Sequence, residues 1–239
     1  MFSSLGTSPS DSPKRGREVS ERILASWSGG KDSAMALFEL IQSGLYDIAA
    51  LVTTVTEDLD RISMHGVRRV LLEQQAEQLG FPLEQVLISP KADNAQYEAR
   101  MGRVFARKRD EGVNRVAYGD LFLEDIKKYR ESHLASLGMA GLFPLWMKDT
   151  TELIHRFIAL GFKAIVTCVD SETLDGSFAG SLIDESFLRR LPSRVDPCGE
   201  NGEFHTFVFD GPIFKKGVRI TAGEVVQRGR FWFRDLLPS

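Results

Sequence analysis

The stretch Ile23-Leu24-Ala25-Ser26-Trp27-Ser28-Gly29-Gly30-Lys31-Asp32-Ser33 decides the fold, because in it an apolar run leads directly into two glycines. The apolar start predicts a buried strand. From Ser33 onward apolar residues recur at helical spacing until Gly44, which predicts a helix. Glycines at such a junction let the backbone turn sharply and approach a ligand, and the unpaired amides at the helix start attract phosphate. The sequence therefore predicts a phosphate-binding loop at residues 28–33.

The same order of strand and helix repeats through the first half of the chain. Further strands are predicted at 48–54, 84–88 and 114–118, and helices at 67–79 and around 97–105. Regular alternation with short connections is typical of an α/β, Rossmann-like fold, in which a parallel sheet carries helices on both faces. Ligands of such sheets bind at the carboxyl ends of the strands. The phosphate-binding loop lies at that edge.

The second half of the chain has a looser pattern and becomes rich in strands toward its end. Asp149 and Glu152 form a capping box that predicts a helix to about residue 160, followed by a strand at 164–170. From Thr206 onward short β-type runs alternate with glycine and proline. We therefore expect a smaller α+β domain packed on the first. The predicted divisions are a Ser/Pro/Gly-rich disordered tail at 1–20, the phosphate-binding domain at 21–130 and the α+β domain at 131–239.

Composition excludes several classes of protein. The 30 basic and 33 acidic residues give a net charge of −3, which argues against binding of nucleic acid through bulk charge. The sequence contains no run of 18 consecutive apolar residues, so it predicts no membrane-spanning helix. The two cysteines, Cys168 and Cys198, do not form a CxxC pair, which argues against structural zinc, an iron–sulfur cluster and a disulfide framework. We expect a soluble, cytoplasmic protein without a nucleic-acid or membrane partner, and the sequence allows a homodimer.

The phosphate-binding loop does not match the two commonest nucleotide motifs. A Walker A loop requires Ser or Thr after its lysine, where this chain has Asp32, and the Rossmann GxGxxG pattern is absent. All six residues from Ser28 to Ser33 instead resemble the SGGxDS loop of the PP-loop ATP pyrophosphatase superfamily, which is similar to adenine nucleotide α-hydrolases and has a HUP-type sheet. That resemblance implies cleavage of ATP between its α and β phosphates and transfer of AMP to an oxygen of the substrate.

A second motif, Asp196-Pro197-Cys198-Gly199-Glu200-Asn201-Gly202-Glu203-Phe204-His205-Thr206, concentrates ionisable side chains and glycines in eleven residues. This density has little structural purpose and indicates a site. The segment resembles the GENGEFHT signature of the diphthine–ammonia ligase family. Gly119-Asp120-Leu121, Glu124-Asp125, Pro144-Leu145-Trp146 and, less specifically, Met64-His65-Gly66 are similar to other landmarks of that family. The resemblance spans about residues 22–228, and the chain looks like a short prokaryotic member.

The resemblance implies an ATP-dependent, AMP-forming ligase that amidates a carboxylate with ammonia, the carboxylate being diphthine or another acid. It implies ATP and Mg²⁺ as cofactors, a PP-loop ATP-binding domain and an acceptor-binding domain. Implied ATP-binding residues are Ser28, Gly29, Gly30, Lys31, Asp32, Ser33 and His65, with Asp32 also holding Mg²⁺. Implied catalytic residues are Lys31, Glu200, Glu203 and His205. The implied acceptor and ammonia site contains Asp120, Glu124, Trp146, Cys198, Gly199, Glu200, Asn201, Gly202 and Glu203.

Two other functions stay open. A PP-loop enzyme that modifies tRNA predicts a basic surface and paired cysteines, and a non-catalytic ATP-binding sensor predicts binding without turnover. Single residues also have two interpretations. Cys198 is either structural or a nucleophile, and Trp146 belongs either to the acceptor pocket or to the core. Cys168 and His133 are expected to be structural.

Overall fold

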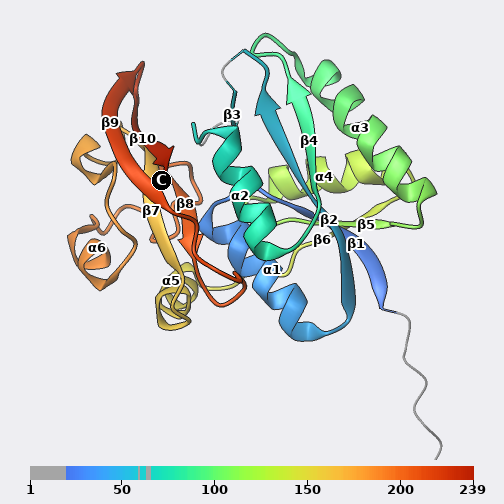
Figure 1. Cartoon of the computed structure of the whole chain (residues 1–239), viewed down its shortest axis with the longest axis horizontal. Helices are drawn as coiled ribbons and strands as arrows, with labels where there is room; N and C mark the ends of the chain where they lie inside the picture. Colours follow the sequence, from blue (N-terminus) through green and yellow to red (C-terminus); the bar gives the residue numbers. More distant parts are fainter. Residues whose placement is uncertain (1–19, 59, 63–65) are drawn as a thin grey trace, which may run out of the picture.

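Two sheets form the frame of the molecule (Figure 1). The computed structural model describes residues 20–58, 60–62 and 66–239. The predicted tail at 1–20 lies outside the described residues except for Ser20, and the predicted ATP-binding residue His65 also lies outside them. Within the described part, no helix is long and apolar enough to cross a membrane.

The first sheet is built from parallel strands in the order β4-β2-β1-β5-β6. Its strands are β1 (Glu21–Ser26), β2 (Tyr46–Thr56), β4 (Leu83–Ile88), β5 (Arg115–Ala117) and β6 (Ala140–Leu142), and the short β3 (Arg61–Ile62) pairs antiparallel with the end of β2. From β1 the chain builds outward to β2 and β4, then returns to the other side of β1 with β5. The strand order therefore reverses at β1 and β5, which is where ligands bind in open α/β sheets.

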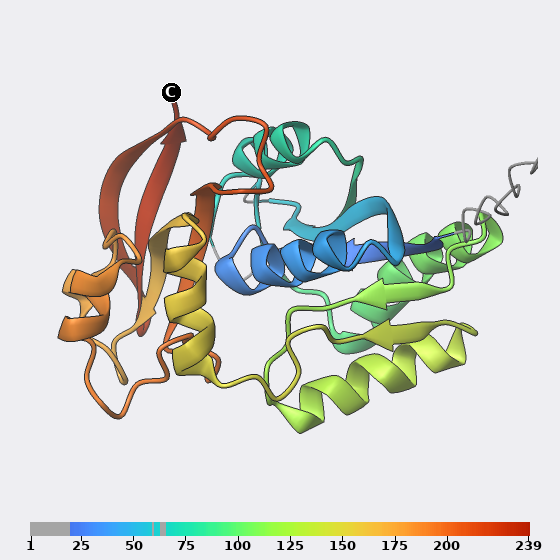
Figure 2. The ribbon, with the colours of Figure 1, turned by 90° about the horizontal axis from the view of Figure 1, so that it is seen from below.

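Helices cover both faces of this sheet (Figures 1 and 2). They are α1 (Lys31–Ser43) and α2 (Arg69–Leu79) on one face and α3 (Asn94–Asp110) and α4 (Glu124–Ser136) on the other. Alternation along β1 explains the two cores, because successive side chains point to opposite faces. Ile23 and Ala25 join the core beneath α1 and α2, whereas Leu24 joins the one that contains Met101 and Phe105 of α3.

The second sheet is antiparallel, with the order β8-β7-β10-β9. Its strands are β7 (Lys163–Asp170), β8 (Phe204–Asp210), β9 (Ile220–Arg228) and β10 (Phe231–Pro238), accompanied by α5 (Thr150–Ala159), η1 (Gly176–Phe178) and α6 (Glu185–Arg190). The predicted capping box of α5 is present, since the Asp149 carboxylate accepts a hydrogen bond from the Glu152 amide at 2.9 Å. The predicted α/β sheet with a smaller α+β part is confirmed.

The two sheets share one hydrophobic core. Side chains of α1, such as Phe38, are in the same buried cluster as Phe162, Phe207 and other residues of the second half. Figure 2 shows α1 between the two sheets. The bounds of α4 and the strand β6 were not predicted, because α4 is largely polar and β6 has three residues. Since β6 extends the first sheet to Leu142, we propose a domain boundary after that strand rather than at residue 130.

An ion-pair network joins β10 to the first sheet. The Asp235 carboxylate contacts the guanidinium groups of Arg61 at 2.9 Å and of Arg68 at 2.7 Å. Burial opposes ionisation of Asp235, but the hydrogen bonds and charges of the two arginines outweigh it and lower the pKa of the carboxyl group. The network therefore stabilises the packing of the two sheets while Asp235 is ionised.

Replacing Asp235 by asparagine should lower the free energy of unfolding by about 1 kcal/mol at neutral pH. Because the pKa is lowered in the folded state, this stabilisation is complete above the unfolded value of about 3.9 and disappears as the pH falls through the lower folded value. Urea unfolding of the wild type and D235N between pH 2.5 and 7 measures the difference. A difference that persisted at the acid end would contradict this origin.

Candidate functional site

The phosphate-binding loop takes the conformation that its glycines predict. Gly29 has φ +79°, the left-handed region that favours glycine, and Gly30 precedes the first residue of α1. A Cβ at Gly29 would lie 2.7 Å from Oε1 of Gln75. Gly119, after β5, approaches the first turn of α1 so closely that a Cβ there would lie 2.8 Å from the carbonyl carbon of Asp32. Glycine is therefore required on both sides of the helix start.

Lys31 is a buried cation at the start of α1. Its residue is 3% exposed, and its Nζ lies 2.8 and 3.0 Å from the two carboxylate oxygens of Asp32. Burial alone would lower the pKa of the lysine, but the charge and hydrogen bonding of Asp32, with a smaller contribution from Glu200, raise it. The amine is therefore a permanent positive charge in a site of low dielectric constant, where it interacts strongly with phosphate.

The second domain contributes Glu200 to the same place. Its Oε1 accepts a hydrogen bond from the backbone amide of Leu121 at 2.8 Å, so the segment after β5 and the loop before β8 are joined. Burial, reinforced by the negative charges of Asp32 and Asp120, raises the pKa of Glu200 to about 7, although the Leu121 amide and Lys31 oppose the shift. Glu200 is thus a carboxyl group that exchanges a proton near neutral pH.

Glu203 lies beneath this loop rather than in the cleft. It is 4% exposed, and its Oε1 accepts hydrogen bonds from the amide of Asp196 and from Nδ2 of Asn201, both at 3.0 Å. Asp196 in turn accepts from the amides of Cys198 and Glu200. These contacts hold the turns of the loop, so the structure places Glu203 as a support of the site.

A cleft of about 540 Å³ runs between the two domains along this loop. Its floor is the start of α1, and the segment after β5 and the loop before β8 form its sides. The tip of the β9–β10 hairpin closes one end with Arg230 and Phe231. The lining includes Ser28, Lys31, Asp32, Ser33, Asp120, Arg130, Gly199, Glu200, Asn201, Gly202, His205 and Thr206. Most of the predicted site residues therefore meet in one cleft.

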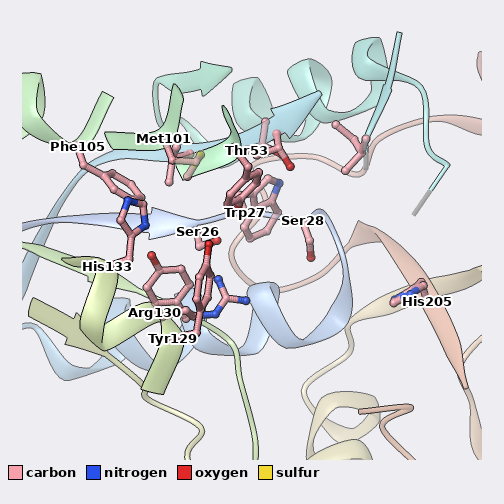
Figure 3. Close-up of a pocket in the computed structure, with 15 residues that line it drawn as sticks. Ser26, Trp27, Ser28, Thr53, Met101, Phe105, Tyr129, Arg130, His133 and His205 are labelled. Carbon is pink, nitrogen blue, oxygen red and sulfur yellow. The ribbon is translucent and has the colours of Figure 1, made fainter. Parts of the chain in front are cut away.

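A second cavity of about 320 Å³ opens beside the first, at the carboxyl ends of β1 and β2. The two cavities share Ser26, Ser28, Tyr118, Arg130 and His205 in their linings. Apolar and aromatic groups make up much of the second cavity, including Met101 and Phe105 of α3 and Tyr129 and His133 of α4 (Figure 3). The combination of an apolar chamber with a polar cleft suits a nucleoside attached to phosphates.

Several predicted residues lie apart from the cleft lining. Glu124 is exposed at the start of α4 and pairs with Lys128, and the Trp146 ring packs edge-on against Phe143. The Cys198 thiol is buried and donates to the carbonyl oxygen of Thr150 at 3.3 Å; burial raises its pKa well above the ordinary range. Neither Trp146 nor Cys198 lines either cavity.

Other residues of the site were missed by sequence analysis. Arg130 pairs with Asp120 at 2.7 Å and stacks its guanidinium over the Tyr118 ring, and Arg230 contacts Asp170 and Glu172 at 2.8 Å. His133, expected to be structural, lines the apolar chamber. Arg130 and His133 lie on α4 and Arg230 lies in the β9–β10 turn, all far from either motif, so only the tertiary fold brings them to the site. Gly119, which directly follows a predicted strand, was the one local sequence signal for this side of the cleft.

The described residues include no cluster of three or more His, Cys, Asp and Glu side chains arranged to hold a metal ion. Mg²⁺ in nucleotide sites usually needs only one or two carboxylates, because the phosphates supply the other oxygens. Asp32 is 30% exposed and lines the cleft beside the helix start. Its carboxylate therefore fits a nucleotide-bound Mg²⁺.

Comparison with known proteins gives a consistent family. The model of the diphthamide synthase N-terminal domain matches residues 21–140, and that of the diphthamide synthase C-terminal domain matches residues 149–236. The chain is 29% identical to a diphthine–ammonia ligase of Danio rerio over 227 residues, covering 86% of this chain and 88% of that protein. Similar proteins of the same name from Bos taurus and Schizosaccharomyces pombe are 27% and 26% identical, and the chain covers 85% and 37% of them. Chain length therefore does not separate this protein from its animal relatives.

Replacing Glu200 by glutamine should stabilise the protein at alkaline pH. A carboxyl group whose pKa is raised in the folded state stabilises the fold below its ordinary value of 4.5 and loses that contribution as the pH rises through about 7. Glutamine still accepts from the Leu121 amide but cannot ionise. At pH 8 we expect the free energy of unfolding of E200Q to exceed that of the wild type by about 1–2 kcal/mol, after allowance for solvent screening. Denaturant titrations at pH 5 and 8 test this, and equal differences at both values would refute it.

Proposed function

This chain belongs to the diphthamide synthase family, and from that premise we propose that it is an ATP-dependent ligase that adenylates a carboxylate and amidates it with ammonia. One observation supports this most strongly. A buried lysine at a phosphate-binding helix start, Lys31, and a proton-exchanging carboxyl group, Glu200, face the same cleft from the two domains. The first suits the chemistry of a nucleotide, and the second suits the chemistry of an amine.

ATP has a clear orientation in this proposal. The apolar chamber beside β1 and β2 takes the adenosine, with Tyr129 and Met101 among its walls. The phosphates then extend over Ser28 to Ser33, where amides at the start of α1 and the helix dipole favour negative charge. This places the α-phosphate between the two cavities and the pyrophosphate near Lys31.

Adenylation needs an in-line attack by a carboxylate oxygen of the acceptor on the α-phosphorus. The bond from that phosphorus to the bridging oxygen breaks, and the electron pair leaves with pyrophosphate. Lys31 and the loop amides stabilise the charge that develops on this leaving group. Mg²⁺ bound to the phosphates would neutralise part of the same charge, and Asp32 is the residue that we propose to hold it.

Amidation follows in the polar cleft. The Glu200 carboxylate, ionised above about pH 7, attracts an ammonium ion and takes one of its protons. The resulting ammonia attacks the carbonyl carbon of the acyl adenylate, the tetrahedral intermediate expels AMP, and the attacking nitrogen loses a second proton. Holding the adenylate between two domains also limits its hydrolysis by water.

The acceptor in this proposal is diphthine or another carboxylic acid, presented as a small molecule or on a protein. A role in sulfur transfer to tRNA has less support from the structure. Both cysteines are buried, and burial raises the pKa of Cys168 to about 12 and that of Cys198 further, so neither thiol is activated.

The products of ATP cleavage test the reaction class. Protein incubated with α-labelled ATP, Mg²⁺, ammonium and fractions of carboxylic acids should release AMP and pyrophosphate only with a fraction that contains the acceptor. When the acceptor carboxylate carries oxygen-18, one labelled oxygen should appear in AMP, because the carboxylate oxygen stays on phosphorus when nitrogen attacks carbon. ADP as the product would exclude the mechanism, and ATP binding without turnover in every fraction would favour a sensor.

The matched variants for this assay are K31M and K148M. Methionine keeps the bulk of the Lys31 side chain but removes the charge, so AMP release should fall by at least about a hundredfold. Lys148 is a partly exposed lysine that pairs with Glu39 outside the cleft, and K148M should keep wild-type turnover.

Glu203 offers a test of support against direct catalysis. Glutamine at this position retains the oxygen that accepts from the Asp196 amide and Asn201, whereas alanine removes it. We expect E203Q to keep amidation within about threefold of the wild type, and E203A to lose most of it because the loop is no longer held. Both variants should bind ATP. A complete loss of amidation in folded E203Q would show that Glu203 itself exchanges the proton.

A further inference from the structure

Gln75 of α2 is a polar residue that neither motif includes. Its side chain is 0% exposed, and it lies 46 positions along the chain from the glycine that it contacts. Its Nε2 donates to the carbonyl oxygen of Gly29 at 3.1 Å and to that of Val208 at 2.5 Å, while its Oε1 accepts from Nε1 of Trp27 at 2.9 Å. A buried amide with three partners is a specific connector, because each lost partner leaves a buried polar group unpaired.

These three partners join the phosphate-binding loop to the second domain. Trp27 and Gly29 flank the first residue of the loop, whereas Val208 belongs to β8. The Val208 amide itself donates to the carbonyl oxygen of Gly29 at 2.9 Å. The loop is therefore hydrogen-bonded directly to β8 through Gly29 and Val208, and Gln75 donates to the carbonyl oxygens of both residues.

Thr206 makes a second connection two residues earlier on β8. Its hydroxyl oxygen accepts from the backbone amide of Lys31 at 3.0 Å. That amide is one of the first four of α1, which have no partner inside the helix, and such groups are usually capped by the residue just before the helix. Here Gly30 has no side chain, and the cap comes from a residue 175 positions later.

We propose that Gln75 and Thr206 are positioning residues that set the phosphate-binding loop in its working conformation from the second domain. The argument depends on the loop geometry. Gly29 has φ +79°, and glycine adopts this left-handed conformation about as readily as the conformations with negative φ. Contacts from outside the loop must therefore favour this conformation over the others. The carbonyl of Gly29 accepts from Gln75 and Val208, and the next two amides donate to the hydroxyl oxygens of Ser28 and Thr206, so these contacts fix the orientation of each peptide up to the first residue of α1. Glu200 and Thr206, the residue that caps α1, lie on one continuous segment, 196–206. A displacement of β8 would therefore disturb both the adenylation step and the amidation step.

The test measures ATP binding directly, in the full chain and without acceptor or ammonium. Variants are T206V, which keeps the shape but lacks the hydroxyl oxygen, T206S, which retains it, and Q75L, which removes all three contacts of the amide. We expect T206V and Q75L to bind ATP about tenfold or more weakly than the wild type, and T206S to bind within about twofold. Binding is measured by calorimetry at a temperature where each variant is shown by circular dichroism to be folded.

A control separates positioning from loss of stability. Thr167 is a buried threonine on the neighbouring β7, and its hydroxyl donates to the carbonyl of His205 rather than to the loop. T167V should therefore lower Tm as T206V does but leave the Kd for ATP unchanged. Equal Kd values for T206V and T206S, or a Kd for T167V that rises as much as that for T206V, would overturn the proposal.

Q75E adds a readout that packing alone would not move. Its second carboxyl oxygen faces two carbonyl oxygens, which it can contact favourably only while protonated. Burial and these carbonyls raise the pKa of such a carboxyl group, so Q75E should bind ATP nearly as well as the wild type at pH 5 and at least about tenfold more weakly at pH 8, relative to the wild type at each pH. A pH-independent ratio would contradict the role of the donated hydrogen bonds. The proposal relies on the proposed function only in that the loop binds ATP: a wild type that bound no ATP would overturn both, whereas normal wild-type binding with unaffected variants would overturn positioning alone.

Discussion

The unpaired amides at the start of α1 are the constraint around which the rest of the molecule is arranged. A helix start leaves four donors without partners, and burying them beneath a second domain is costly unless acceptors are supplied. The structure supplies acceptors from Ser28 for the Gly30 amide and from Thr206 for the Lys31 amide, and the first residues of α1 line the cleft, where a phosphate group can accept from the remaining amides. Gly30 and Gly119 keep side chains away from this position. The fold therefore leaves an anion-binding surface at its centre.

Charge balance in the cleft follows from the same arrangement. Lys31 is buried without direct access to much solvent, so it needs the adjacent carboxylate of Asp32 while no nucleotide is bound. A nucleotide would bring further negative charge, and the nearby carboxyl groups then become easier to protonate. Burial, reinforced by the negative charge of Asp32, already raises the pKa values of Glu200 and Asp120, although Arg130 opposes the shift at Asp120. The cleft is thus electrostatically prepared to release or take up protons when substrates bind.

Local sequence patterns were sufficient for four strands of the first sheet, β1, β2, β4 and β5, since each is an apolar run bounded by a turn and each predicted helix has a regular apolar face. The polar helix α4 gave no such signal, because its packing involves few buried residues, chiefly Leu134. The loop 28–33 was predictable as a phosphate site because its chemistry is contiguous in the chain. Gln75, Arg130 and Arg230 were not, since an isolated polar residue on a helix or in a hairpin turn looks like a solvated one until the fold shows what surrounds it. Trp146 and Glu124, which were placed in the site by resemblance, pair with Phe143 and Lys128 and do not line the cleft, so their role in the site stays a prediction.

The dense polar motif at 196–206 has two tasks, and the structure separates them. A loop with successive turns at Gly199 and Gly202 cannot pair its amides as a strand does, so side-chain acceptors must take the place of the neighbouring strand. Asp196 and Glu203 are those acceptors, with side chains directed into the loop itself. Glu200 and Asn201, which lie between them in the sequence, line the cleft instead. Composition alone makes every carboxylate in such a segment look catalytic. A turn also needs fixed negative oxygens to hold its amides, so hydrogen-bond partners distinguish the two kinds of carboxylate: Asp196 and Glu203 accept from amides of the loop itself, whereas Glu200 accepts from Leu121 across the cleft.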